Sequence, residues 1–257
     1  MQNLYPLFER NRILKKELLW SLRDYAFGHL RLEYKEYADG ILQGCDVRVE
    51  DNQIVVSPGI IKLGDFILLM SEEESIGYEP SDEFAAVKMR FDTEQISLDY
   101  VLHKMELVSD KHMDLKENEF EVCRYKLQEG AILRDQHTDL WDMDTEYNTL
   151  NYIYATWGGL GGQSIAPAVS RRFAREILKS DSPQPHDVSF AYLCLGQPGA
   201  VPMEILMDYL TRRGQERESR MTNEDIFRQM CKVIKNIRIA TESRQQEQTG
   251  RKKIIVY

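Results

Sequence analysis

The feature that most constrains this fold is a change of hydrophobic period at Ile41, where apolar residues begin to alternate with polar ones. Alternation with a period of two, interrupted by short polar or Pro/Gly pairs, is typical of short strands joined by tight turns. The strand-forming runs are Val47–Glu50, Ile54–Val56 and Phe66–Leu69, and the turn pairs are Asp51-Asn52, Pro58-Gly59 and Gly64-Asp65. The sequence therefore predicts a compact meander of short strands.

Three further runs rich in β-forming residues follow the meander: Phe84–Phe91, Ile96–Val108 and Phe120–Leu127. The polar segments between them, such as Asp110–Glu119, are too short to hold the helix that a parallel crossover needs. We therefore expect these runs to form an antiparallel sheet of several strands.

Helical spacing of apolar residues flanks the predicted strands on both sides. At the start of the chain, Phe8–Leu30 predicts an amphipathic helix whose apolar stripe includes Ile13, Leu14, Leu18 and Leu22. An isolated helix of this length is marginal in water, so the stripe needs a partner surface. We expect it to pack either in a helix bundle between copies of the chain or under the sheet.

The last third of the chain has the pattern of a small helical domain. After the acidic loop Asp135–Glu146 and a strand-like segment Tyr152–Trp157, three helix starts are expected. The signals are Pro167 at a first helical position, Pro202 opening a helix that ends near Gly214, and a capping box from Thr222 to Asp225. A polar linker follows from Thr241 to Gly250.

These elements define an α+β fold in four parts: an N-terminal helix, an antiparallel β-rich middle domain, a small helical C-terminal domain and a terminal arm. The expected bounds are residues 1–35 for the helix, 36–147 for the β-rich domain, 148–240 for the helical domain and 241–257 for the linker and arm. The arm ends in Ile254–Tyr257, four β-formers. We expect them to add a strand to a neighbouring subunit, to return to the chain's own sheet, or to remain a frayed tail.

Composition excludes several classes of protein. A chain of 257 residues with 42% apolar and 29% charged residues can bury a sizeable core. Apolar runs such as Phe66–Met70 are far short of the roughly 20 residues that span a bilayer, and the start of the chain has no signal-peptide pattern. Four dispersed cysteines (Cys45, Cys123, Cys194, Cys231) predict buried thiols in a reducing compartment rather than a zinc site or a disulfide framework.

The net charge of −9 lowers the expectation of general nucleic-acid binding, but the charge is uneven. Residues 211–257 hold twelve Lys/Arg against six Asp/Glu, whereas residues 71–150 hold 21 acidic and eight basic residues. Either this is a solvated surface, or the acidic middle faces a basic surface of a neighbour.

The glycine-rich stretch Gly158–Ser164 is the most unusual local motif. Dense glycines let backbone N–H groups approach a phosphate, and Gly162-Gln-Ser164-Ile-Ala166 is one residue from a nucleophile elbow. The Lys-Ser/Thr pair of a P-loop is missing, and strands followed by helices do not make a hydrolase fold. A tight turn or docking loop is the favoured interpretation, with a nucleotide-binding protein or hydrolase as the alternative.

Other candidate chemistry is weaker. The segment His137–Asp144 offers carboxylates and one imidazole but lacks the glycine and terminal glutamate of a calcium loop, so it predicts an acidic surface loop. A DNA-associated regulator would use a basic cluster near the C-terminus, but the Gly214–Met221 connection is too long for a helix-turn-helix and acids interrupt the cluster. Its members are Arg212, Arg213, Arg217, Arg220, Arg228, Lys232, Lys235 and Arg238. We assign no catalytic, cofactor-binding or metal-ligating residue.

The segment Gly40–Val49 followed by Ile54–Ile67 resembles the attachment region of phage tail-fibre and baseplate proteins. The shared pattern is G-(I/V)-x-x-G-x-x-V, a strand, a polar turn, a strand, Pro-Gly, a strand and G-x-x-I. Gly44 and Gly64 permit sharp chain reversals, and Pro58-Gly59 sets a turn. No long repetitive shaft follows, which favours a compact subunit.

The resemblance implies a non-enzymatic structural component of a phage-tail-like contractile particle (a prophage, tailocin or contractile injection system), acting as a baseplate or tail-fibre adaptor subunit. It implies protein partners within the tail or baseplate and a homo-oligomer. From the residues themselves we expect no cofactor and no membrane partner, and the net charge of −9 disfavours a nucleic-acid partner. Assembly is expected in the bacterial cytoplasm, and the finished subunit belongs to the particle.

Overall fold

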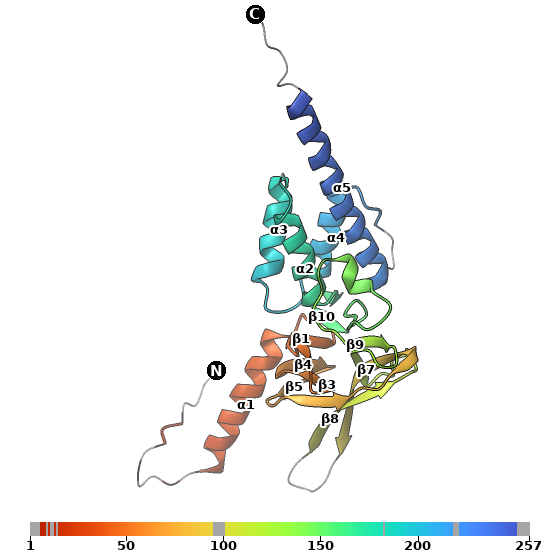
Figure 1. Cartoon of the computed structure of the whole chain (residues 1–257). Helices are drawn as coiled ribbons and strands as arrows, with labels where there is room; N and C mark the ends of the chain where they lie inside the picture. The colour runs from red at the N-terminus through yellow and green to blue at the C-terminus, as the bar shows by residue number, and fades with distance from the viewer. Residues whose placement is uncertain are drawn as a thin grey trace, which may run out of the picture.

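A computed structural model of the chain describes residues 6–8, 10, 13, 15–94, 101–181, 183–217 and 221–250 (Figure 1). In Figure 1 the strands form the lower body, α2 to α5 stand above it, and α1 lies at its side. The α+β class is confirmed. The order is α1 (Lys16–Glu33), β1 (Gly40–Gly44), β2 (Val47–Glu50), β3 (Gln53–Val56), β4 (Gly59–Leu63), β5 (Phe66–Met70), β6 (Glu74–Gly77), β7 (Ser81–Glu94), β8 (Leu102–Asp110), β9 (Glu119–Leu127), the 3₁₀ helix η1 (Trp141–Asp144), β10 (Trp157–Gly159), β11 (Gly162–Ser164), α2 (Pro167–Leu178), α3 (Pro185–Gly196), α4 (Met203–Arg212) and α5 (Asn223–Gly250).

The meander is present as predicted, with its turns at the expected pairs. β2 and β3 form a hairpin through Asp51 and Asn52, whose φ angles of 47° and 61° suit a two-residue hairpin turn. Gly64 adopts a φ of 59° between β4 and β5, and Gly59 opens β4 after Pro58. Local turn chemistry thus sets the strand ends in this region.

The strands form three sheets rather than one. Their orders are β11-β10-β1-β4-β5, β2-β3-β6 and β8-β7-β9. All pairs are antiparallel except β1 with β10, which pair in parallel through Ile41 and Trp157. The three runs expected to form an antiparallel sheet do so as β7, β8 and β9. The parallel pair of β1 with β10 was not expected; it joins strands that are far apart in the sequence.

The third sheet is built on the long strand β7. β8 pairs with it from Leu102 to Asp110, later than the expected start at Ile96; residues 95–100 lie outside the described chain. β9 pairs on the other side and carries an irregularity opposite Val87 and Lys88. The predicted runs are therefore confirmed as strands with shifted bounds.

The helical part contains more helix than the sequence indicated. α2, α4 and α5 begin at the predicted signals, but α3 was not expected; Pro185 opens it and Gln184 with Asp187 forms a capping box. α5 continues to Gly250 through the segment expected to be a linker. Tyr152–Trp157 is irregular, with a turn at Ile153 and Tyr154 and strand beginning only at Trp157. No helix in the described part of the chain is long and apolar enough to cross a membrane.

The predicted opening helix starts later and ends later than expected, at Lys16 and Glu33. Ile13 precedes it and is 83% exposed, so it does not belong to the helical stripe. Leu14 and the C-terminal arm beyond Gly250 fall outside the described residues.

One continuous apolar core joins the sheets to the helices. At its helical end Phe190 of α3 stacks on Tyr209 of α4, and Phe173 of α2 meets both rings edge-on. Ile41 and Trp157 lie where the two parts meet. The four cysteines are free thiols, three of them buried and Cys231 half-buried. Burial raises the pKa of Cys45, Cys194 and Cys231 to about 12, so these thiols are protonated at neutral pH.

Two glycines let the helical part close against β1. A Cβ added at Gly158 would overlap the carbonyl oxygen of Ala38, and one added at Gly199 would overlap that of Leu42. Gly162, four positions after Gly158, has open space around it and no positive φ. Close backbone approach therefore requires glycine at 158 and not at 162.

We predict that Gly158→Ala destabilises the protein by about 1–3 kcal/mol, because the methyl group forces β10 away from the chain before β1. Urea unfolding followed by circular dichroism measures the change, with Gly162→Ala as the matched control. Equal midpoints for the two variants would contradict the close approach.

Candidate functional site

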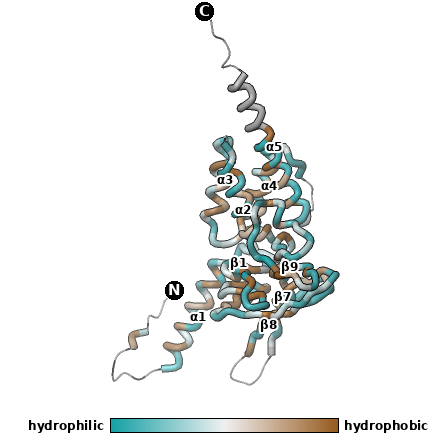
Figure 2. The backbone as a smooth tube through the Cα atoms, viewed as in Figure 1, coloured by the Kyte–Doolittle hydropathy of each residue, from teal (hydrophilic) through white to brown (hydrophobic). Residues whose placement is uncertain are grey.

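Among the described helices, α1 alone has no buried residue. Figure 2 shows apolar residues along α1, outside the packed body. Its large apolar side chains are 45% to 76% exposed: Leu19, Trp20, Leu22, Tyr25, Phe27 and Leu32. Exposed apolar side chains gathered on one helix mark an interaction surface more often than scattered ones do.

The apolar residues of α1 fall on two opposite sides of the helix. At 3.6 residues per turn, one side carries Leu19, Trp20, Phe27 and Leu30, and the other carries Leu18, Leu22, Tyr25 and Leu32. We call the second set the outer stripe. A cavity of about 240 Å³ lies between the first side and β5, lined by Phe27 and Leu30 with Phe66 and Ile67.

The outer stripe has no cover within the described chain: Leu22, Tyr25 and Leu32 are 48%, 68% and 76% exposed, and Leu18 is half-buried. Packing under the sheet, one of the two expected arrangements, is therefore not what the structure has, because α1 lies against the edge strand β5. Packing between copies of the chain stays a prediction.

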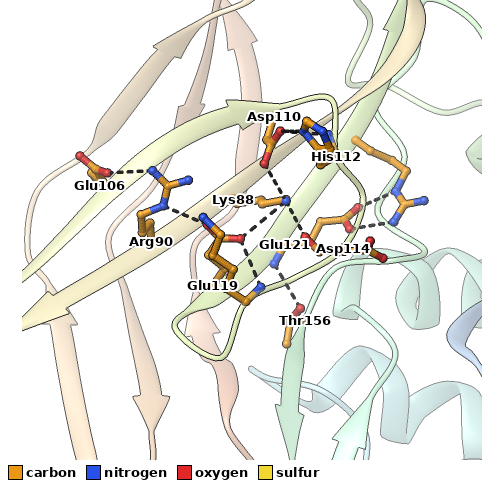
Figure 3. A network of polar contacts seen from close by, with 11 residues as sticks. Lys88, Arg90, Glu106, Asp110, His112, Asp114, Glu119, Glu121 and Thr156 are labelled. Atoms are coloured by element: carbon orange, nitrogen blue, oxygen red, sulfur yellow. Dashed lines mark hydrogen bonds and ion pairs between the residues drawn. The ribbon is translucent and has the colours of Figure 1, made fainter.

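A second feature, buried in the β8-β7-β9 sheet, is a charged network centred on Lys88 (Figure 3). The Lys88 side chain is fully buried, and its Nζ lies 3.1 Å from Asp110 Oδ2 and 3.6 Å from Glu119 Oε2. It also donates to the backbone oxygen of Asp114, at 2.8 Å. That bond ties the β8–β9 loop over the sheet.

Cross-strand pairing extends the network along the same face of the sheet. Arg90 lies opposite Glu106 on β8 and Glu119 on β9, and its Nε donates to Glu119 Oε1 at 2.9 Å. Glu121, opposite Lys88, accepts two hydrogen bonds from Arg124, at 2.6 and 2.7 Å. The buried ions are thus paired and hydrogen-bonded, as buried charges must be.

The environments of these acids shift their pKa values in two directions. Hydrogen bonds from His112 and Lys88 lower the pKa of Asp110, and the Arg90 and Lys116 hydrogen bonds lower that of Glu119 although burial opposes them. Burial raises the pKa of Glu121 despite its bonds to Arg124. Sequence reasoning missed this network, although the alternation of Lys88 with Arg90 and of Glu119 with Glu121 is a period-two polar face.

The glycine-rich stretch forms the β10–β11 hairpin, with Gly161 at a φ of 77° in its turn. Ser164 is buried, and its hydroxyl donates to the Val201 carbonyl oxygen at 2.5 Å. Its one described hydrogen bond thus goes to the backbone and not to a histidine. The hairpin is a tight turn, as favoured, and it docks the helical part onto β1 through Trp157.

The acidic segment His137–Asp144 is organised around Asp142. Arg134 donates to both Asp142 oxygens, at 2.6 and 2.8 Å, and these bonds lower the pKa of Asp142. His137 Nε2 bonds to the Leu150 carbonyl oxygen at 2.8 Å. Within the part of the chain that the structure describes, no group of three or more His, Cys, Asp or Glu side chains could hold a metal ion.

The basic residues near the C-terminus are largely paired inside the chain. Arg212 contacts Asp208, Arg213 contacts Asp187, Arg228 contacts Glu224, and Arg238 contacts Glu176. Arg220 lies outside the described residues. Lys232 and Lys235 are exposed on α5. The predicted cluster is thus dispersed over two helices and partly neutralised.

No protein-family model and no curated protein matches the chain. Among solved structures, a chain of the type VI secretion system TssK-TssF-TssG baseplate subcomplex is 10% identical with a TM-score of 0.42, over 92% of this chain and 99% of that one. A crystal structure of TssK is 9% identical with a TM-score of 0.36, and the match covers 91% of this chain and 68% of that one. A chain of the baseplate complex from the type VI secretion system is 11% identical with a TM-score of 0.40, and the match covers 92% of this chain and 70% of that one. The similarity is coarse, and TM-scores this low assign no role to any residue.

We predict that Lys88→Met costs about 3–5 kcal/mol of unfolding free energy, because it removes the buried cation that Asp110 and Glu119 share from an otherwise intact ion cluster. Urea unfolding at neutral pH measures the loss. Lys111→Met is the matched control, since Lys111 is 64% exposed and lies 3.9 Å from the exposed Glu83. Similar losses for both variants would show that the network contributes nothing.

We also predict that stability falls as the pH drops below about 4. Asp110, Glu119 and Asp142 have folded-state pKa values below their unfolded values, so their contribution is present above the unfolded pKa and is lost on acidification. Glu121, whose pKa is raised, acts in the opposite direction.

Asp142→Asn should therefore flatten the dependence of the urea midpoint on pH between about 5 and 3. Asp82→Asn, at an exposed site without a described polar partner, should leave the slope unchanged. A slope that is the same in wild type and Asp142→Asn would refute the role of the Arg134 pair.

Proposed function

We propose that this chain is a non-catalytic structural subunit of a phage-tail-like contractile particle, a baseplate or tail-fibre adaptor that joins neighbouring subunits through α1. The observation that carries the proposal is the absence of any buried residue in an 18-residue helix that is apolar on two sides. A helix with this pattern is normally enclosed by protein on both sides.

The energetics of α1 favour a protein partner. Burying apolar surface releases about 25 cal/mol per Å², and a fully buried Leu or Phe side chain contributes about 1.5–3 kcal/mol. The outer stripe alone presents Leu22, Tyr25 and Leu32. Since a helix this short is marginal alone, contact with a neighbour would stabilise both the helix and the assembly.

The resemblance to tail-fibre attachment and baseplate proteins supports the finer assignment. It rests on residues 40–67, which form β1 to β5 beside α1. Gly44 and Gly64 have φ angles of 71° and 59°, so the glycines of that pattern occupy positions where other residues are strained. The attachment-like strands and the uncovered helix are therefore adjacent.

A structural role also fits the polar groups that were candidates for chemistry. Ser164, Asp142 and His137 each bond to a backbone carbonyl or to an arginine of the same fold. The proposal therefore includes protein partners in the tail or baseplate, a homo-oligomeric arrangement through α1, and assembly in the bacterial cytoplasm before incorporation into the particle.

We predict that Leu22→Asp abolishes assembly while leaving the folding of the body intact, because α1 contributes no buried residue to it. Solution mass is measured for the protein alone and after co-expression with its genomic neighbours, and thermal unfolding is followed in parallel. Ile132→Asp is the matched control, since Ile132 is 81% exposed and lies away from α1 in the sequence.

The expected result is a large particle for wild type and Ile132→Asp and a smaller one for Leu22→Asp, with similar melting temperatures. A wild-type protein that stays monomeric with every neighbour would overturn the proposed function. A Leu22→Asp variant that assembles normally would place the contact elsewhere than the outer stripe.

A further inference from the structure

A pocket of about 250 Å³ lies where the β body meets α2. α2 lines it with Arg171, Arg172 and Arg175, and the β body and the loop after β9 contribute Asp46 and Asp135. Aromatic and apolar residues complete it: Ile41, Val122, Tyr152 and Trp157. We call this the α2 pocket.

The arginines of the α2 pocket differ in how they are held. Arg171 Nη2 donates to the backbone oxygens of Gln197 and Pro198, at 2.8 and 3.0 Å. The guanidinium groups of Arg172 and Arg175 form no hydrogen bond or ion pair with any residue that the structure describes, although the Arg175 carbonyl oxygen accepts the Lys179 N–H. Two guanidinium groups are therefore available at the pocket wall, each with a full set of donors.

The start of α2 lines the same pocket through Pro167 and Ala168, so the positive end of the helix dipole adds to the positive charge on that side of the pocket. Arg175 lies in the last turn of α2, where the helix dipole favours a cation. A negative group in the pocket would offset the charge of the two unpaired guanidinium groups.

The two carboxylates of the pocket, Asp46 and Asp135, do not neutralise the arginines. Asp135 Oδ2 accepts a hydrogen bond from the Val49 N–H at 2.9 Å, which holds the carboxylate on the β2 side. Neither Asp46 nor Asp135 forms an ion pair with an arginine among the described residues. His137 adds no charge at neutral pH, because burial lowers its pKa, with Arg134 and Arg172 contributing.

The size of the pocket limits what it can hold. Cofactor and drug-sized ligands occupy about 300–1,000 Å³, so a site of about 250 Å³ suits a side chain or a short peptide segment. Arginine pairs bind carboxylates through two parallel hydrogen bonds, and the carboxylates of the pocket suit the N–H donors of a peptide backbone. An acidic peptide has both kinds of group: side-chain carboxylates for the arginines and backbone N–H donors for the aspartates.

We propose that the α2 pocket binds an acidic segment of a neighbouring subunit, with Arg172 and Arg175 holding a Glu or Asp carboxylate. This inference rests on the proposed function, because the segment belongs to a partner in the assembly. Charge complementarity supports the partner chosen: the chain has a net charge of −9, so a cationic wall is a local exception to its surface.

The test uses the full-length protein and a blocked Glu-Glu-Glu peptide, titrated by calorimetry at about 0.02 M and about 0.15 M salt. Arg172→Gln/Arg175→Gln is compared with Lys179→Gln, a cation at the end of the same helix that does not line the pocket and contacts Glu176. Trp157 fluorescence reports whether the peptide enters the pocket, in a variant with Trp20 and Trp141 changed to Phe. Inorganic phosphate is the second probe.

We expect wild type and Lys179→Gln to bind the peptide, and the double variant to bind at least about tenfold more weakly, since a charge-assisted contact contributes more than about 1.4 kcal/mol. No peptide binding by wild type, or equal binding by the double variant, would overturn the proposal. Binding of phosphate but not of the peptide would also overturn it, in favour of a small-anion site.

Solution mass with the genomic neighbours separates this proposal from the proposed function. If the chain joins a larger particle while the peptide does not bind, the pocket proposal fails and the assembly role stands. If the peptide binds but the chain joins no particle, the pocket is a peptide site and the assembly role fails.

Discussion

The burial of the Lys88 ammonium group between carboxylates is the constraint on which the β body depends. An unpaired charge at a fully buried position would cost several kcal/mol, so Asp110, Glu119 and the Asp114 carbonyl must all be in place when the sheet closes. These groups come from β8, β9 and the loop between them. One lysine on the central strand thus fixes the register of both neighbours and the position of the loop.

The Lys88 network is also linked to the neighbouring sheet, through β9. The register irregularity at Val87 and Lys88 places Glu121 opposite Lys88, and the Glu121 backbone exchanges hydrogen bonds with Thr156. The Thr156 carbonyl oxygen then accepts the Ile41 N–H at 3.0 Å, next to the parallel pair of Ile41 and Trp157. A continuous chain of backbone contacts therefore joins the charged network to the strands that carry the helical part.

Sequence reasoning recovered the parts of the fold that local chemistry determines. Asp51-Asn52 and Gly64 produced the expected turns, and Pro167, Pro202 and the Thr222–Asp225 box marked real helix starts. α3 was missed because its apolar residues surround the helix without a polar face. The pairing of β1 with β10 was missed because it joins residues more than a hundred positions apart, where no local signal exists.

For the candidate sites, too, the sequence predicts local patterns but not contacts between distant segments. The apolar stripe of α1 was visible as helical spacing, but only the structure shows that the chain leaves it uncovered. The burial of Lys88 has no local signal, since an alternating polar face is usually solvated and the Asp114 carbonyl that it bonds belongs to the distant β8–β9 loop. The pocket beside the α2 arginines cannot be recognised from the sequence, because Asp46, Asp135 and Trp157 line it from distant segments of the chain.

The packed body has its own core, and α1 adds no buried residue to it. This division bears on how the chain could associate with a neighbour. The ions of the β8-β7-β9 sheet are paired within the chain, and the aromatic residues of α2, α3 and α4 pack on one another, so binding at α1 requires no rearrangement of either part. Docking would then approach rigid-body association, in which little binding energy is lost to reordering the partners. The remaining ordering cost lies in α1 itself, which is too short to be stable alone in water. In the proposed assembly, subunit contact and helix stability would therefore be coupled, and the affinity would depend on how fully a neighbour encloses the outer stripe.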